Sequence, residues 1–79
     1  MPRFVLQVAG GPDKAIEART IGQAKCEAVR FAGRLICDSA DRFWDTADFY
    51  MTVTDEDGLV LFTLQFVGTD APAIRGTSP

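Results

Sequence analysis

Alternation of apolar and polar residues marks three segments of the chain as strands. Residues 3–8 place apolar side chains on every second position, which is the pattern of a half-buried strand. The same period-2 pattern runs through residues 49–54 and again through residues 59–66. Residues 14–19 contain a single large apolar residue, so a fourth, short edge strand there stays an open alternative.

A helical pattern occupies the middle of the chain, from Thr20 to about Ser39. Thr20 followed three residues later by Gln23 fits a capping box, in which the threonine hydroxyl accepts an early helical N–H. At 100° per residue, one apolar stripe should lie on the sheet. This stripe contains Ile21, Ala24, Ala28, Phe31, Ala32 and Leu35, and Val29 and Ile36 widen it on one side.

The last two strands are predicted to form a hairpin around residues 55–58, Asp-Glu-Asp-Gly. A four-residue loop with glycine in the left-handed region pairs Thr54 with Leu59. The inner face then contains Phe49, Met51, Val53, Val60, Phe62 and Leu64, with Met51 opposite Phe62. A three-residue loop would set Phe62 opposite Thr52, apolar against polar, so the four-residue loop is predicted.

These patterns predict an α+β fold. We expect an antiparallel sheet of three strands, or four if residues 14–19 pair, with one long α-helix packed on one face. The element order is β-(β)-α-β-β. Residues 1–67 should form this single domain, and residues 68–79 lack periodicity and contain two prolines, which predicts a flexible C-terminal tail.

Composition fits a small globular domain rather than a disordered chain. The 79 residues are 47% hydrophobic and 24% charged, and so short a chain builds a thin core that self-association would supplement. The net charge of −3 argues against nucleic acid or an anionic membrane as partner. Residues 1–37 carry six basic against three acidic residues, whereas residues 38–57 carry seven acidic against one basic, so we expect one acidic end.

Cysteine usage and the N-terminus indicate a reduced, cytoplasmic protein. The chain has no signal peptide pattern and no apolar run long enough to span a membrane. Cys26 and Cys37 are eleven residues apart, about 16 Å along a helix, which is too far for a disulfide within the chain. There is no histidine and no C-x-x-C motif, so we expect neither a cofactor nor a metal site.

Three features together resemble a family of short alphaproteobacterial domains of unknown function. They are the opening Met-Pro-Arg-Phe, the alanine-rich helix beginning near Ala24, and the closing hairpin Val-Thr-Asp-Glu-Asp-Gly-Leu-Val-Leu of residues 53–61. The resemblance spans residues 1–67 and implies a strand–helix–hairpin fold. It implies no activity, so no catalytic residue is carried over.

Two alternative functions remain open. If Met1 is removed, Pro2 becomes an N-terminal secondary amine, which acts as general base in the tautomerase superfamily, whose openings are similar to Met-Pro-Arg-Phe-Val. Those folds use parallel β-α-β units, however, whereas residues 49–66 indicate an antiparallel hairpin. A weak nucleic-acid-binding module is the other alternative, although the outward sheet face offers only Tyr50 as aromatic, with Arg3 at its edge.

Two further groups have structural interpretations that we favour over functional ones. Aspartates at positions 38, 41, 45 and 48 could ligate calcium or magnesium, but acids around a hairpin are more often solvated turn residues. Phe43 and Trp44, between helix and hairpin, could anchor a partner. We expect them instead to close the end of the core.

The leading prediction is a non-catalytic protein-interaction or regulatory module that forms a homodimer or binds another protein. A mixed outer sheet face, containing Leu59 and Thr63 among others, and a small-residue helix face opposite the apolar stripe are the candidate surfaces. The residues predicted to form the interaction surface are Val5, Tyr50, Thr52, Leu61, Gly22, Cys26, Gly33 and Cys37.

Overall fold

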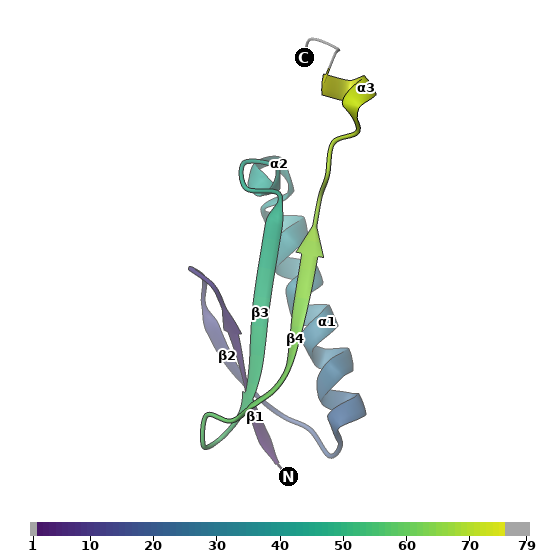
Figure 1. Cartoon of the computed structure of the whole chain (residues 1–79). Coiled ribbons are helices and arrows are strands. Elements are labelled where there is room, and N and C mark those ends of the chain that lie inside the picture. Colours follow the sequence, from purple (N-terminus) through teal and green to yellow (C-terminus); the bar gives the residue numbers. More distant parts are fainter. Residues whose placement is uncertain (1, 76–79) are drawn as a thin grey trace.

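The fold is a four-stranded antiparallel sheet with one long helix across one face (Figure 1). The computed structural model describes residues 2–75. The elements are β1 (Arg3–Val8), β2 (Asp13–Glu17), α1 (Ile21–Asp38), α2 (Ala40–Phe43), β3 (Asp48–Asp55), β4 (Val60–Val67) and α3 (Pro72–Arg75). The strand order is β2-β1-β3-β4, with every neighbouring pair antiparallel. The predicted α+β class is confirmed, and the strand left open by the sequence is present as β2.

Local signals at the start of α1 act as the sequence predicts. The Thr20 hydroxyl accepts a hydrogen bond from the Gln23 amide at 3.0 Å. The Gln23 side chain accepts in return from the amide of Arg19 at 2.7 Å. These bonds satisfy backbone donors that the first helical turn leaves free, and they fix where the helix begins.

The core is small because alanine forms the buried face of α1. Ala24, Ala28 and Ala32 are the buried residues of the helix, one turn apart. Opposite them, the largest fully buried side chains are Leu6, Met51 and Val53. Larger helical residues of the predicted stripe lie at its borders, since Phe31 and Leu35 are half-buried and Ile21 is exposed. The methyl groups of the alanines thus let the helix lie close to the sheet.

The β3–β4 loop has three residues instead of the four predicted. The amide of Asp55 donates to the carbonyl of Leu59 at 3.0 Å, which leaves residues 56–58 as the loop. The Asp55 carboxylate accepts from the amides of Asp57 (2.8 Å) and Leu59 (3.0 Å) and thereby stabilises the short turn. Gly58 has φ +87°, so its predicted left-handed conformation is confirmed.

The predicted register of this hairpin is wrong by two residues, and a bulge explains the difference. The observed pairs are Thr54–Val60, Val53–Phe62, Met51–Leu64 and Phe49–Phe66. Leu61 has no partner on β3, which is the mark of a β-bulge. Without the bulge, the three-residue loop would set Phe62 opposite Thr52. The extra residue instead keeps Phe62 on the helix side, while Val60 is exposed rather than on the inner face.

Acidic residues gather at two ends of the molecule, not at one as predicted. The fold is elongated, 52 × 18 × 18 Å, and β3 runs along it from Asp48 to Asp55. The aspartates around α2 therefore lie at one end of the sheet, and the acidic loop 55–57 lies at the other, as the places of α2 and of the β3–β4 loop in Figure 1 show. Beyond β4, the predicted tail contains the short helix α3, and its last four residues, 76–79, lie outside the described part of the chain.

Candidate functional site

An apolar trough runs between α1 and β4. Five residues on neighbouring turns of α1 form one wall, and three consecutive residues of β4 form the other. The volume of the trough is about 380 Å³, and nearly all of its surface is apolar. Its lining consists of Val29, Ala32, Gly33, Ile36, Cys37, Leu64, Gln65 and Phe66. We call this set the α1–β4 trough.

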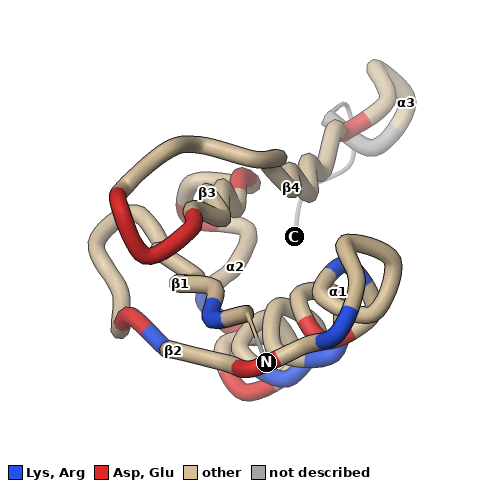
Figure 2. Tube along the Cα trace, turned by 90° about the horizontal axis from the view of Figure 1, so that it is seen from below, with Lys and Arg blue, Asp and Glu red and all other residues tan. Residues whose placement is uncertain are grey.

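The trough stays open because the sheet curls over α1 without closing on it. Figure 2, along the helix, shows β4 held apart from α1 while β2 comes near it on the other side. Val29 is 56% exposed on the helix wall, and Phe66 is 51% exposed on the strand wall. Gly33 adds no side chain that could fill the space between them. Apolar surface is therefore left uncovered where two elements of the fold meet.

Aromatic residues extend the trough toward α2. The Phe43 ring meets Phe66 edge to face, with ring centroids 5.4 Å apart, and meets Trp44 in the same way at 5.6 Å. Trp44 lies on the backbone of Gly68, where a Cβ atom would come within 2.6 Å of the indole. Trp44 is 58% exposed. The expectation that both rings close the core is thus wrong for Trp44, which lines a hollow continuous with the trough.

The other end of the trough is marked by a cation over an aromatic ring. The ammonium of Lys25 lies 5.8 Å from the centre of the Phe62 ring, at a distance at which the two attract. Next to it, Cys26, Val29 and Arg30 form a shallow hollow with Lys25 on the exposed side of α1. The trough therefore has a basic end near the start of α1 and an aromatic end near α2.

The two edges of the sheet differ in their protection. β2 is five residues long and carries Asp13, Lys14 and Glu17, and charges on a short edge strand prevent pairing with another chain. β4 is eight residues long and contains neither a charged residue nor a proline. Its far side pairs with no strand among residues 2–75. The edge beside the trough is thus the one that can accept another strand.

The residues predicted for the two candidate surfaces, the outer sheet face and the small-residue helix face, lie on two sides of the fold. Val5, Tyr50 and Thr52 are on the sheet face away from α1, and Leu61 is at the bulge. On the helix, Gly33 and Cys37 line the trough, whereas Cys26 lies in the shallow hollow beside it. Gly22 is exposed near the start of α1. The outer-face set and the helical set are therefore two separate surfaces.

Six trough residues were absent from the predicted surface: Val29, Ala32, Ile36, Leu64, Gln65 and Phe66. The helical wheel does place Val29 and Ile36 beside the apolar stripe, on the side toward the small residues. That signal was available in the sequence. The position of β4 at the sheet edge was not, because it depends on strand order.

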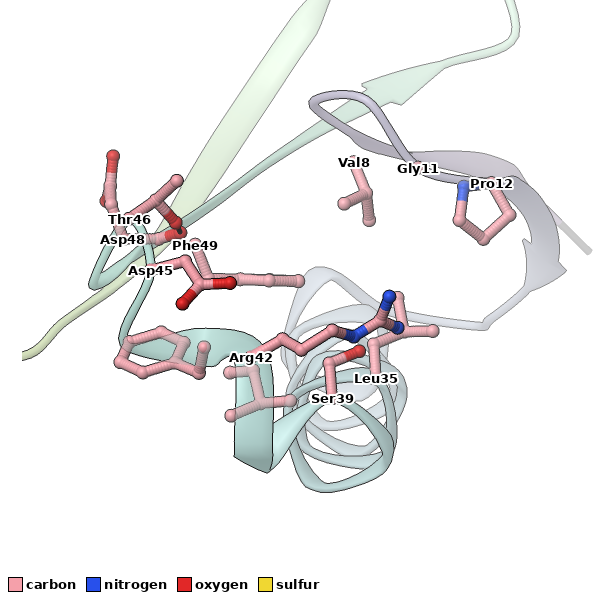
Figure 3. Close-up of a pocket in the computed structure, with 12 residues that line it drawn as sticks. Val8, Gly11, Pro12, Leu35, Ser39, Arg42, Asp45, Thr46, Asp48 and Phe49 are labelled. Atoms are coloured by element: carbon pink, nitrogen blue, oxygen red, sulfur yellow. Dashed lines mark hydrogen bonds between the residues drawn. The ribbon is translucent and has the colours of Figure 1, made fainter.

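A second hollow, about 420 Å³ in volume, lies between the β1–β2 turn, the end of α1 and the start of β3. Figure 3 shows Val8 directed into it from β1 and Arg42 stretched across its rim from α2. Thr46 donates to the carbonyl of Asp48 at its edge (3.5 Å). Ser39 lines the hollow, but the chain contains no histidine to deprotonate its hydroxyl. The hollow resembles a partly open end of the core.

The alternative chemistries find limited support in the geometry. Pro2 is exposed, and its carbonyl accepts from the amide of Ala18 at 3.1 Å. Residues 2–4 and the acidic loop 55–57 surround a shallow hollow there, but the strands are all paired antiparallel, unlike the tautomerase units. Within residues 2–75, no three acidic or cysteine side chains are grouped closely enough to hold a metal ion.

Two other expectations concern the thiols and the membrane. Cys26 and Cys37 are both free and exposed, as the helical distance between them predicts. Among the described helices, none has the length and apolar character needed to cross a membrane.

Comparison with known proteins gives one match. No curated protein and no solved structure shows significant similarity to the chain. A family model matches residues 3–67, which covers the whole sheet and α1, together with the hairpin and helix that suggested the resemblance. The chain therefore belongs to the family described as Domain of unknown function (DUF6894).

Proposed function

We propose that this domain is a non-catalytic protein-interaction module that binds its partner with the α1–β4 trough and the open edge of β4. One observation carries the proposal: the unprotected, uncharged edge strand and the apolar trough lie side by side. A strand added to the edge gains main-chain hydrogen bonds, and side chains on its inner face enter the trough. Soluble domains rarely leave such apolar surface uncovered unless it binds something.

The outer sheet face supports a partner less well. On β3 and β4 this face is mixed: Thr52, Thr63 and Gln65 lie among the exposed apolar residues Tyr50, Val60 and Val67. A face of this kind is compatible with solvent. It also lacks the basic residues beside aromatic ones that nucleic-acid modules present, which is why we favour a protein partner.

We further propose that the domain is bacterial, as the resemblance implies, and that it works in the cytoplasm. The two exposed thiols are compatible with a reducing compartment. The tautomerase alternative has a simple test, since intact mass reports whether Met1 is retained. Retention would remove the secondary amine that this chemistry needs.

Site-specific photo-crosslinking tests the interaction surface. A photoreactive phenylalanine analogue replaces Phe66 in the trough, and a matched variant carries it at Tyr50 on the opposite face of the sheet. Each variant is expressed in cells of the source organism, and irradiation should give a discrete crosslinked product from position 66 and none, or much less, from position 50. Absence of any product from position 66, or equal products from both positions, would contradict the proposal.

A further inference from the structure

Along β4, the backbone N–H and C=O groups of successive residues point alternately toward β3 and toward the open edge of the sheet. Just beyond the last pair of the ladder, the amide of Gly68 donates to the carbonyl of Ala47 at 2.9 Å. In an antiparallel pair, residues that exchange hydrogen bonds alternate with residues that do not. Counting back from Gly68 in steps of two, the backbone N–H and C=O groups of residues 62, 64 and 66 point toward β3. The N–H and C=O groups of Thr63 and Gln65 therefore point to the open edge.

The order of aromatic, polar and aliphatic side chains in β4 is the same in both directions from Leu64. Leu64 has a polar residue on each side and then a phenylalanine on each side, in the sequence Phe62-Thr63-Leu64-Gln65-Phe66. A two-fold interface places one surface patch against an identical copy of itself, so the patch must be complementary to itself. Antiparallel pairing of two β4 strands about an axis at Leu64 meets this condition.

In that register, each side chain meets one of its own kind. Phe62 lies opposite Phe66 of the second copy, Leu64 opposite its equivalent, and Thr63 opposite Gln65. Since Thr63 and Gln65 both have outward backbone groups, the two pairs that they form exchange two hydrogen bonds each, about four in all. Side-chain pattern and backbone direction thus agree on one axis.

Neighbouring registers fit less well. With the two-fold axis between two residues, a residue whose N–H and C=O groups point to the open edge would lie opposite one whose groups point to β3. An antiparallel ladder does not allow this pairing. An axis at Thr63 satisfies the backbone, but it sets Leu61 opposite Gln65, apolar against polar. Leu61 is also the bulged residue, which interrupts regular pairing at that end of β4.

No charged residue lies within the two strands that pair. β4 carries no charge, so no like charges meet across the joined strands. The acidic loop 55–57 projects away from the open edge, on the side of β1 (Figure 2). Phe66, half exposed in the single chain, would be covered by Phe62 of the second copy, and cross-strand aromatic pairs are stabilising.

We propose that the partner of this domain is a second copy of the same chain, joined by antiparallel pairing of the two β4 strands about a two-fold axis at Leu64. This inference rests on the proposed function, because it names what the open edge and the trough bind. The dimer has one continuous eight-stranded sheet with both helices on the same face. The two α1–β4 troughs lie next to each other beneath it.

Disulfide trapping between singly substituted chains tests the register. In a background of Cys26→Ser and Cys37→Ser, one chain carries Thr63→Cys and another Gln65→Cys, both at exposed positions. Directly opposite residues of a hydrogen-bonded pair have Cα atoms about 5.5 Å apart, within the range of a disulfide. The mixture should therefore form the mixed disulfide about tenfold faster than either chain alone forms a disulfide with its own copy. In a dimer of identical chains the two thiols are diagonal neighbours about 7–8 Å apart.

The outcomes separate this inference from the proposed function. Faster linkage of Thr63→Cys chains to each other would indicate the axis at Thr63 and overturn the register. A chain that stays monomeric between about 5 and 500 µM in sedimentation equilibrium would overturn the dimer. If position 66 still crosslinks to a different protein in cells, the interaction function stands while the dimer is wrong. If neither occurs, both are wrong.

A proline variant gives an independent test that does not disturb the monomer. The amide of Thr63 points away from β3, so Thr63→Pro should keep the fold, as judged by circular dichroism. It removes a donor from each of the two symmetric pairs and blocks the approach of the second strand, which should weaken dimerisation at least about 100-fold. Thr63→Val keeps the amide and should dimerise within about threefold of the unmodified protein. Undiminished dimerisation of a folded Thr63→Pro variant would refute the pairing.

Discussion

Replacing Met51 by alanine removes one of the three large side chains that are fully buried in this domain. Met51 is 0% exposed on β3, between Val8 of β1 and Leu64 of β4. The alanine face of α1 cannot move into the space, because its methyl groups are too short to fill it and both neighbouring strands hold the backbone in place. We therefore expect little collapse around the cavity.

The magnitude follows from the atoms removed. Three heavy atoms at about 0.8 kcal/mol each give a transfer term near 2.4 kcal/mol. Without collapse, a cavity contribution brings the cost to the middle of the range of about 2–5 kcal/mol seen for such substitutions. A chain of 79 residues has a total stability of roughly 4–12 kcal/mol, so Met51→Ala should remove about a quarter or more of it.

Urea denaturation followed by far-ultraviolet circular dichroism measures this effect. The midpoint should fall while the dependence of the unfolding free energy on urea stays unchanged, and about 3 kcal/mol should lower Tm by roughly 12–24 °C. Met51→Leu serves as the control and should cost less than about 1.5 kcal/mol. All variants must be compared at one protein concentration, because dimerisation adds stability. A loss below about 1 kcal/mol for Met51→Ala would refute the close packing of helix and sheet at this point.

Two turn and cap residues give further predictions. The Cβ of Gly58→Ala would meet no atom within 4 Å, so its expected loss of about 1–2 kcal/mol in the free energy of unfolding comes from the left-handed backbone alone. Gly58→Asn should cost clearly less, because asparagine tolerates this conformation better. Equal losses for the two variants in urea denaturation would contradict this cause. Thr20→Ala removes the acceptor of the Gln23 amide and should lower the free energy of unfolding by about 1 kcal/mol, whereas Thr20→Ser keeps a hydroxyl and should retain most of the stability. Thermal melts of the unmodified protein and the two variants measure this, and equal Tm values for Thr20→Ala and Thr20→Ser would contradict the role of the hydroxyl.

Elements governed by neighbouring residues were predictable from the sequence. The cap at Thr20 and the left-handed Gly58 depend on contacts within a few residues, and both are confirmed. The hairpin register was not predictable because two local preferences conflict. The Asp55 carboxylate stabilises a three-residue loop, whereas the apolar pattern requires Phe62 on the helix side. The bulge satisfies both, and the alternation of apolar residues gives no sign of it.

The candidate site was only half predictable for a similar reason. Helical spacing alone identifies the side of α1 that contains Gly33 and Cys37. Whether anything covers that side depends on strand order, which places β1 and β3 in the middle of the sheet and leaves β4 at its edge. Trp44 was misplaced because its position depends on Gly68, a residue 24 positions further along the chain that lies against the indole.

The unpaired residue in β4 has a consequence for how the length of this domain can vary. Losing one residue from a strand normally turns every later side chain to the opposite face. Deleting Leu61 would not, because Phe62 would then follow Val60 directly and still meet Val53, giving an uninterrupted ladder. Relatives one residue shorter here can thus retain the same core and the same free edge, and a gap at this position in a family alignment is compatible with an unchanged fold.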